Sequence, residues 1–179
     1  METKFYYIHG LHGSSKSKKF LDLKQKYSNI ECLEWSIHDD INVKLSEWKE
    51  EIYKNKNNLI CVIASSTGAN LAYQLRNSCK PNWFSLVLIN PLFDVADIFN
   101  PSIMPENVKV YLEKITKHSN SLLFFGGKDS VLNNSKYHSK DNYIGNNNQI
   151  IVDKNDNHSF ENLKNYYHLI DNLVDAIYL

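Results

Sequence analysis

Short apolar runs of strand length recur along the whole chain and are rich in aromatic and β-branched residues. They lie at residues 5–8, 30–35, 59–64, 85–89, 122–125 and 149–152. Most of them lack polar alternation, which is typical of strands that are covered on both faces, as in a parallel sheet. The pattern therefore predicts about six mainly parallel strands.

Helical periodicity appears between and after these runs. Ile41, Leu45, Trp48 and Ile52 are spaced by four, three and four residues. A longer C-terminal helix is predicted by Phe160, Leu163, Tyr167, Ile170, Val174 and Ile177, with Ser159 as its N-cap. Strands that alternate with helices predict an α/β protein, a three-layer α/β/α sandwich with right-handed crossovers, formed by a single domain over residues 1–179.

Two segments depart from this alternation. Residues 91–105 contain three of the four prolines together with Phe93, Phe99 and Met104, which indicates an irregular apolar excursion after the fourth strand. This excursion is either a wall of a binding pocket or ordinary packing over the edge of the sheet. Residues 126–148 are rich in Gly, Asn, Lys and Ser and predict an exposed connection with one helical turn.

Composition and charge exclude several classes of protein. The 179 residues balance twenty basic against twenty acidic side chains, so no nucleic-acid partner is expected, and the cluster of Lys16, Lys18 and Lys19 is interpreted as a solvated helix face. Three cysteines without C-x-x-C spacing indicate neither a disulfide framework nor a zinc site, and they favour a reducing cytoplasm. The longest apolar stretch is too short to span a membrane, and no signal peptide is predicted. The oligomeric state is left open.

The third strand is followed by Ala64-Ser65-Ser66-Thr67-Gly68 and then by a helical pattern. A serine in so tight a strand-to-helix turn requires small residues two positions before and after it, and Ser66 meets that spacing. Alanine stands at 64 where glycine is usual. The five residues are also compatible with a serine-rich helix N-cap without catalytic role.

The first strand is followed by a glycine-containing loop, His9-Gly10-Leu11-His12-Gly13. Such a loop can offer a backbone N–H to an oxyanion, and the N–H groups of Leu11 and Thr67 are the natural pair. His12 is a candidate substrate contact. An alternative is a metal-dependent hydrolase in which His9 and His12 bind a metal together with a carboxylate such as Asp129, although their spacing at the end of a strand does not favour it.

The fifth and sixth strands are followed by Asp129 and His158. The Gly127-Lys128 pair lacks the glycine that a phosphate loop needs five residues earlier, so nucleotide binding is rejected. The ends of parallel strands meet at one edge of a sheet, and the chain order Ser, Asp, His is that of α/β-hydrolases. Asp94, after the fourth strand, is the alternative acid.

The segments YYIHGLHGSSKSKK, ASSTGAN, INPLF, GGKDSVL and DNHSFEN together resemble the small bacterial YqiA-like esterases of the α/β-hydrolase superfamily, over nearly the whole chain. The resemblance implies a minimal α/β-hydrolase fold without a separate lid domain. It also implies hydrolysis of small-molecule acyl esters, and of acyl-CoA thioesters as a second class, through Ser66, Asp129 and His158, without metal or cofactor. Phe93, Phe99 and Met104 are the candidate acyl contacts. The remaining alternative is a catalytically silent hydrolase fold that serves as a binding module.

Overall fold

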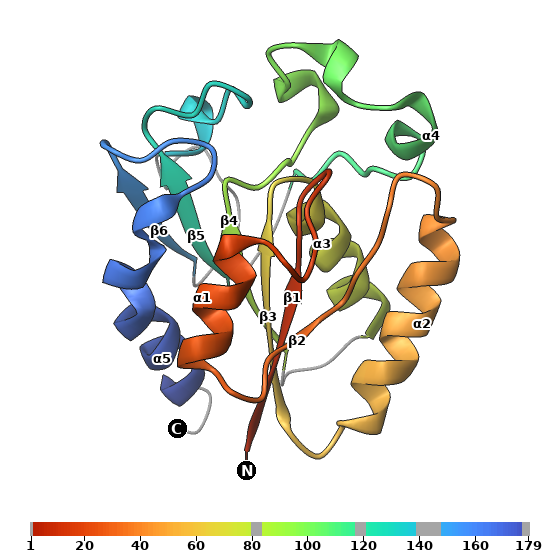
Figure 1. Cartoon of the computed structure of the whole chain (residues 1–179), viewed down its shortest axis with the longest axis vertical. Helices are drawn as coiled ribbons and strands as arrows, with labels where there is room; N and C mark the ends of the chain where they lie inside the picture. The colour runs from red at the N-terminus through yellow and green to blue at the C-terminus, as the bar shows by residue number, and fades with distance from the viewer. Residues whose placement is uncertain (1, 80–83, 117–120, 139–147, 177–179) are drawn as a thin grey trace.

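Six strands form one parallel sheet, which confirms the number and direction that the apolar runs predict. Their order in the sheet is β2-β1-β3-β4-β5-β6. The computed structural model of the chain describes residues 2–79, 84–116, 121–138 and 148–176. The strands are β1 (Thr3–Ile8), β2 (Glu31–Cys32), β3 (Leu59–Ser65), β4 (Phe84–Ile89), β5 (Ser121–Gly126) and β6 (Gln149–Asp153). Because all strands run in one direction, the loops that follow them share one edge of the sheet (Figure 1).

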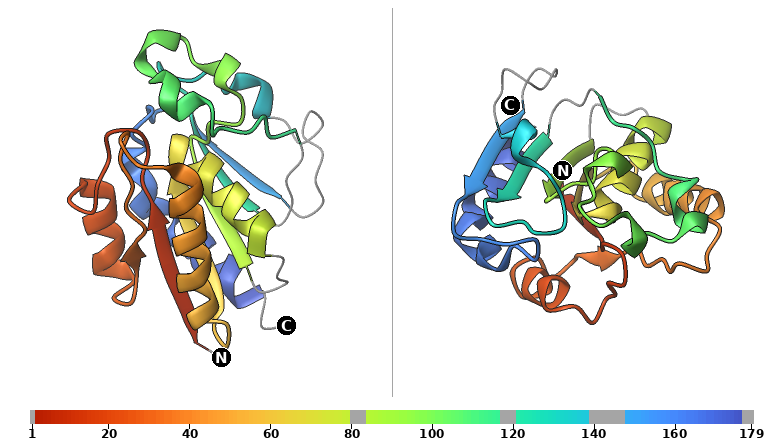
Figure 2. Two further views of the ribbon diagram at one scale, coloured as in Figure 1. Left: turned by 90° about the vertical axis from the view of Figure 1, so that its right-hand side faces the viewer. Right: turned by 90° about the horizontal axis from the view of Figure 1, so that it is seen from above.

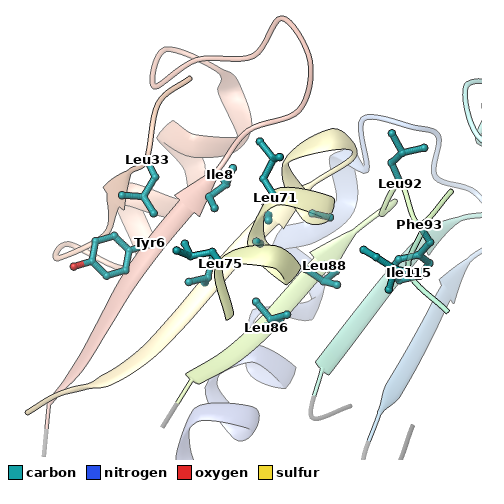
Figure 3. Close-up of a cluster of buried hydrophobic side chains, with 14 of the residues drawn as sticks. Tyr6, Ile8, Leu33, Leu71, Leu75, Leu86, Leu88, Leu92, Phe93 and Ile115 are labelled. Carbon is teal, nitrogen blue, oxygen red and sulfur yellow. The ribbon is translucent and has the colours of Figure 1, made fainter. Parts of the chain in front are cut away.

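Helices cover both faces of this sheet. One face packs against α1 (Lys18–Lys26) and α5 (Tyr167–Asp175), and the other against α2 (Ile41–Lys54) and α3 (Thr67–Cys79). Figure 3 shows part of the second layer, in which Leu71 and Leu75 of α3 lie against Ile8 and Leu88 of the sheet. Burial on both sides explains why the central strands are apolar throughout.

None of the helices in the described ranges has both the length and the apolar character that a bilayer crossing requires.

The second strand is shorter than the predicted run of residues 30–35. Leu33 N still donates to Tyr7 O at 2.8 Å, but the chain then leaves the sheet. Trp35 turns to stack on His9, with ring centroids 5.7 Å apart, and its Nε1 donates to the His9 carbonyl oxygen. An aromatic contact with the loop after β1 thus replaces the end of the predicted strand.

The C-terminal helical segment begins differently from the prediction. A 3₁₀ helix, η5 (Glu161–Tyr166), precedes α5, and Ser159 is not its N-cap. The N-cap position of η5 is Phe160, whose side chain cannot accept, and the upstream carboxylate of Asp156 caps the helix instead by accepting from the N–H groups of Glu161 and Asn162 at 2.8 Å each. The predicted helical position Ile177 lies outside the described residues.

The excursion after β4 is irregular but well anchored. It contains η1 (Val95–Asp97) and η2 (Pro101–Ile103), and the single turn α4 (Glu106–Lys109) follows it; Figure 2 shows this part of the chain above the ends of the strands. Buried Asn70 of α3 donates to Leu92 O and Glu113 O, and buried Asp97 accepts from the Lys136 and Tyr137 side chains. The connection after β5 has its helical turn at η3 (Ser135–Tyr137), while residues 139–147 fall outside the described ranges.

Candidate active site

Ser66 occupies the single residue between β3, which ends at Ser65, and α3, which begins at Thr67. Its φ of 52° lies in the left-handed region, which is unfavourable for serine. The turn is held by the Ser66 N–H, which donates to Ile89 O at 2.9 Å. Adjacent Ser65 instead forms a buried hydrogen bond of 3.0 Å with the Tyr7 hydroxyl. The two serines therefore have different environments, and Ser66 is the strained one.

The residues on either side of this turn are small for steric reasons. A Cβ at Gly68 would lie 2.3 Å from the carbonyl oxygen of His9, so the start of α3 can approach the loop after β1 only with glycine there. Ala64 is fully buried, and its methyl group packs in the same core cluster as Ala69 and Ala72 of α3. Alanine at position 64, where glycine is usual, is thus accommodated within the core.

Ser66, His158 and Asp129 form a continuous hydrogen-bonded chain. His158 Nε2 lies 3.1 Å from Ser66 Oγ, and His158 Nδ1 lies 2.9 Å from Asp129 Oδ2. An ionised carboxylate only accepts, so Nδ1 carries the proton and Nε2 is free to accept from the serine hydroxyl. The imidazole is held in the orientation that general-base catalysis by Nε2 requires.

The Asp129 carboxylate is held from several sides. Oδ1 accepts from the N–H groups of Val131 and Leu132 at 2.8 and 2.9 Å, and Oδ2 accepts from Asn134 Nδ2 at 3.2 Å in addition to His158. Its side chain is only 3% exposed. The acid is therefore both buried and fixed in position toward the imidazole.

The other carboxylates that follow strands are engaged elsewhere. Asp94 pairs with Lys114 at 2.8 Å and caps η1, and Lys114 holds the pKa of Asp94 below its usual value. Asp153 accepts from the Tyr166 hydroxyl at 3.0 Å, and Asp156 caps η5. The structure thus places Asp129, and not Asp94, beside His158.

Buried Asn90 was not found by sequence reasoning. It follows β4 with a φ of 42°, and its Nδ2 donates to the carbonyl oxygens of Asn157 and His158 at 2.9 Å each. Its Oδ1 accepts from Gly126 N at 2.7 Å. One amide thus ties the loop that carries the histidine to the end of the strand that precedes the acid. The INPLF segment contains this residue, and only the unusual placement of an asparagine directly after an apolar strand could have signalled it.

The predicted oxyanion donors lie beside Ser66. A Cβ at Gly10 would be 3.0 Å from the Ser66 Cβ, which shows how closely the loop after β1 approaches the serine. Leu11 and Thr67 both line the same cavity as Ser66. Within the described residues neither backbone N–H donates a hydrogen bond, so both are available to a ligand.

His9 and His12 do not come together with Asp129. The buried ring of His9 donates from Nδ1 to Gly10 O and accepts at Nε2 from Trp35 N, and burial lowers its pKa. His12 is exposed at the rim of the cavity. Over the part of the chain that the structure describes, no three His, Cys, Asp or Glu side chains are grouped so that they could hold a metal ion.

A cavity of about 730 Å³ opens over the catalytic groups. His12 and Met104, two of the residues expected to contact substrate, line it together with Ile98 and Ile103 of the excursion. Phe93 and Phe99 do not line it, contrary to expectation. Phe93 is fully buried and packs edge-on against Tyr137 at 5.1 Å, while Phe99 is 58% exposed and points away from the core. In an irregular segment no periodicity indicates which side chains face inward.

Solved structures with the same architecture identify the fold. Mouse alpha/beta hydrolase domain-containing protein 10 is 13% identical, with a TM-score of 0.66, and the match covers 97% of this chain and 90% of that one. Human thioesterase 2 is 13% identical with a TM-score of 0.62, covering 100% and 99%. Est1E from Butyrivibrio proteoclasticus is 14% identical with a TM-score of 0.60, covering 98% and 87%. The chain has an α/β-hydrolase fold. No protein-family model and no curated protein sequence matches it.

Within the α/β-hydrolase fold, the six strands of this chain make a minimal sheet. Each predicted catalytic side chain follows a different strand, β3, β5 or β6, at the carboxyl edge where this fold places its ligands. Identities this low establish the architecture alone. What the site does must be argued from its own geometry.

Proposed function

We propose that this chain is a serine hydrolase that cleaves carboxylic esters, with thioesters as a second substrate class, as its sequence resemblance to the YqiA-like esterases implies. The observation that carries the proposal is the chain of hydrogen bonds from Ser66 through His158 to Asp129, at 3.1 and 2.9 Å. That constellation activates a hydroxyl for attack on an acyl carbon.

In the first half of the reaction, Ser66 Oγ attacks the carbonyl carbon and His158 Nε2 takes the hydroxyl proton. The carbonyl oxygen becomes an oxyanion, and the free N–H groups of Leu11 and Thr67 stabilise it, each worth about 10² to 10³ in rate. Asp129 stabilises the imidazolium without accepting its proton. His158 then delivers the proton to the leaving alcohol or thiol, and an acyl-serine remains.

In the second half, water replaces the leaving group. His158 Nε2 accepts a proton from the water as its oxygen attacks the acyl-serine, the same N–H groups hold the oxyanion, and the proton returns to Ser66 Oγ as the acid departs. No metal or cofactor is needed for any step. The buried hydrogen bonds of Asp129 keep the imidazole in one orientation through both halves.

Two observations disfavour the alternatives. A silent binding module is disfavoured by the φ of 52° at Ser66, because backbone strain of this kind clusters at active sites, where it forms part of the mechanism. A metal-dependent hydrolase through His9 is disfavoured because both ring nitrogens of His9 are engaged with Gly10 and Trp35.

Labelling with a fluorophosphonate tests the proposal, because such a probe reacts with activated serines. We expect one adduct, mapped by mass spectrometry to Ser66, and none on Ser65, whose hydroxyl is bonded to Tyr7. Ser66→Ala should abolish both labelling and hydrolysis of a p-nitrophenyl ester, while Ser65→Ala serves as the matched control. An active protein that is labelled at Ser65, or not labelled at all, would overturn the assignment.

A further inference from the structure

The cavity over Ser66 has two arms of opposite character. The excursion and the connection after β5 form an apolar arm lined by Leu92, Ile98, Ile103, Met104 and Leu132. On the other side, the aromatic and aliphatic residues Tyr7, Phe160, Leu163 and Tyr167 form the floor, and the polar side chains of α1 and η5 gather around it as a polar arm: Ser17, Lys18, Lys19, Asp22, Glu161 and Lys164. The apolar arm belongs to the layer of α2 and α3, and the polar arm to the layer of α1 and α5. Ser66 and His158 lie at the sheet edge between them.

Of the three lysines in the polar arm, Lys18 is exposed to water, whereas Lys19 is partly buried at the cavity wall. Lys164 is paired with Asp22 at 2.9 Å, but in the described part of the chain Lys19 Nζ forms neither a hydrogen bond nor an ion pair. Burial lowers the pKa of Lys19 to about 8, and the charge of Asp156 opposes that shift. Lys19 is thus a partly desolvated ammonium that lines the cavity without a partner among the described residues, and a bound anion would replace the water contacts that it has lost.

Asp156 does not satisfy Lys19. Its Oδ1 accepts from the N–H groups of Asn157 and Glu161, and its Oδ2 from that of Asn162. This carboxylate is therefore committed to holding the start of η5. Ser17, the N-cap of α1, lines the same arm, so the positive end of the helix dipole adds to the charge of Lys19 there.

We propose that the substrate carries an anionic oxygen group, a carboxylate or a phosphate, which Lys19 binds in the polar arm while an apolar part of the same molecule lies in the other arm. The inference rests on the proposed function, because it places the scissile carbonyl at Ser66 between the arms. It identifies the substrate class as amphiphilic esters with a negative charge on one side of the reacting bond.

Two pairs of esters test on which side the charge lies. The p-nitrophenyl monoester of glutaric acid and its methyl ester differ by one charge in the acyl part. The butyrate ester of p-hydroxybenzoate and that of its methyl ester differ by one charge in the leaving group. The quantity compared is the ratio of kcat/KM for the charged and the neutral member of each pair.

The wild-type protein should prefer the charged member of one pair. Lys19→Met removes the ammonium but keeps an unbranched chain, and we expect it to lower that preference by about 10- to 100-fold, the range of a hydrogen bond to a charged group. Lys19→Arg should retain the preference. Lys24→Met is the matched control, since Lys24 lies on the same helix but does not line the cavity. Unchanged ratios for both pairs in Lys19→Met would overturn the inference.

Equilibrium binding separates this inference from the proposed function. On a Ser66→Ala background, which cannot form the acyl-enzyme, binding of both ester pairs is measured; the charged member of at least one pair should bind more tightly than its neutral partner, and Lys19→Met should remove the difference. Charge-dependent binding without hydrolysis by the wild type would contradict the proposed function only. Hydrolysis by the wild type together with binding that is insensitive to Lys19 would contradict the inference only.

Discussion

Asn90 holds the backbone of His158, because its Nδ2 donates to the His158 carbonyl oxygen at 2.9 Å. The same amide accepts from Gly126 N, three residues before Asp129. A residue that contacts no substrate thus sets the distance between the loop of the histidine and the loop of the acid. Its full burial means that no water can replace these hydrogen bonds if they are lost.

Asn90→Asp should lower kcat more than it changes KM. A carboxylate retains the acceptor for Gly126 N but cannot donate to the carbonyl oxygens of Asn157 and His158, so the histidine loop loses its attachment. Displacement of a catalytic group by about 1 Å can cost on the order of 10² in rate. Steady-state kinetics on a neutral p-nitrophenyl ester, at a matched folded fraction, measure the effect.

Asn70→Asp is the control for the Asn90 variant. Asn70 is equally buried and also donates to two carbonyl oxygens, that of Leu92 in the excursion and that of Glu113 in the segment between α4 and β5, neither of which belongs to the histidine loop. We expect a comparable loss of stability, with a larger effect on KM than on kcat. If both variants lose kcat to the same extent, Asn90 acts on stability alone.

The positions of Ser66, Asp129 and His158 could be predicted from the sequence because each lies in the turn or loop that follows an apolar run. In a parallel sheet the carboxyl ends of all strands lie at the same edge, so residues that follow different strands come close together in space. The small residues around Ser66 added a local steric signal. Neither inference needed knowledge of side-chain packing.

Asn90 and Lys19 could not be predicted in this way, because their roles depend on partners far along the chain. The amide of Asn90 meets the carbonyl of His158, 68 positions away. Lys19 was interpreted as part of a solvated cluster, and only the packing of α1 beside η5 places it at a cavity wall. The directions of the Phe93 and Phe99 side chains could not be predicted either, because an irregular segment has no helical or strand periodicity that indicates which side chains face inward.

Asp129→Asn should reduce turnover by about 10⁴, because the amide favours the imidazole tautomer that cannot accept from Ser66. Asp94→Asn should cost less than about tenfold by the same reasoning, since Asp94 pairs with Lys114 and does not contact the histidine. Single-turnover or steady-state rates of the two variants decide between the carboxylates. Should Asp94→Asn be the more damaging change, the acid has been misassigned.

Activity should fall in acid, because a protonated imidazole cannot accept the hydroxyl proton at Nε2. His158→Ala should remove this acid limb together with nearly all activity, whereas His12→Ala should retain the limb, since His12 lies at the cavity rim and outside the relay. Profiles of kcat/KM against pH for the wild type and both variants provide the measurement. An acid limb that is lost in His12→Ala but kept in His158→Ala would show that His12 is the base.

The stability of the fold should also decrease in acid, through His9. Burial lowers the pKa of His9 in the folded state, whereas in the unfolded chain it has its ordinary value near 6.5. The unfolded state therefore binds a proton that the folded state resists, so the free energy of unfolding falls as the pH drops below about 6.5.

His9→Gln removes the titrating group while its amide oxygen can still accept from Trp35 N. Urea unfolding at about pH 8 and about pH 5.5 should show a smaller loss for this variant than for the wild type, with His12→Gln behaving like the wild type. Equal losses in His9→Gln and the wild type would mean that another group, such as His138, whose pKa burial also lowers, controls the acid sensitivity.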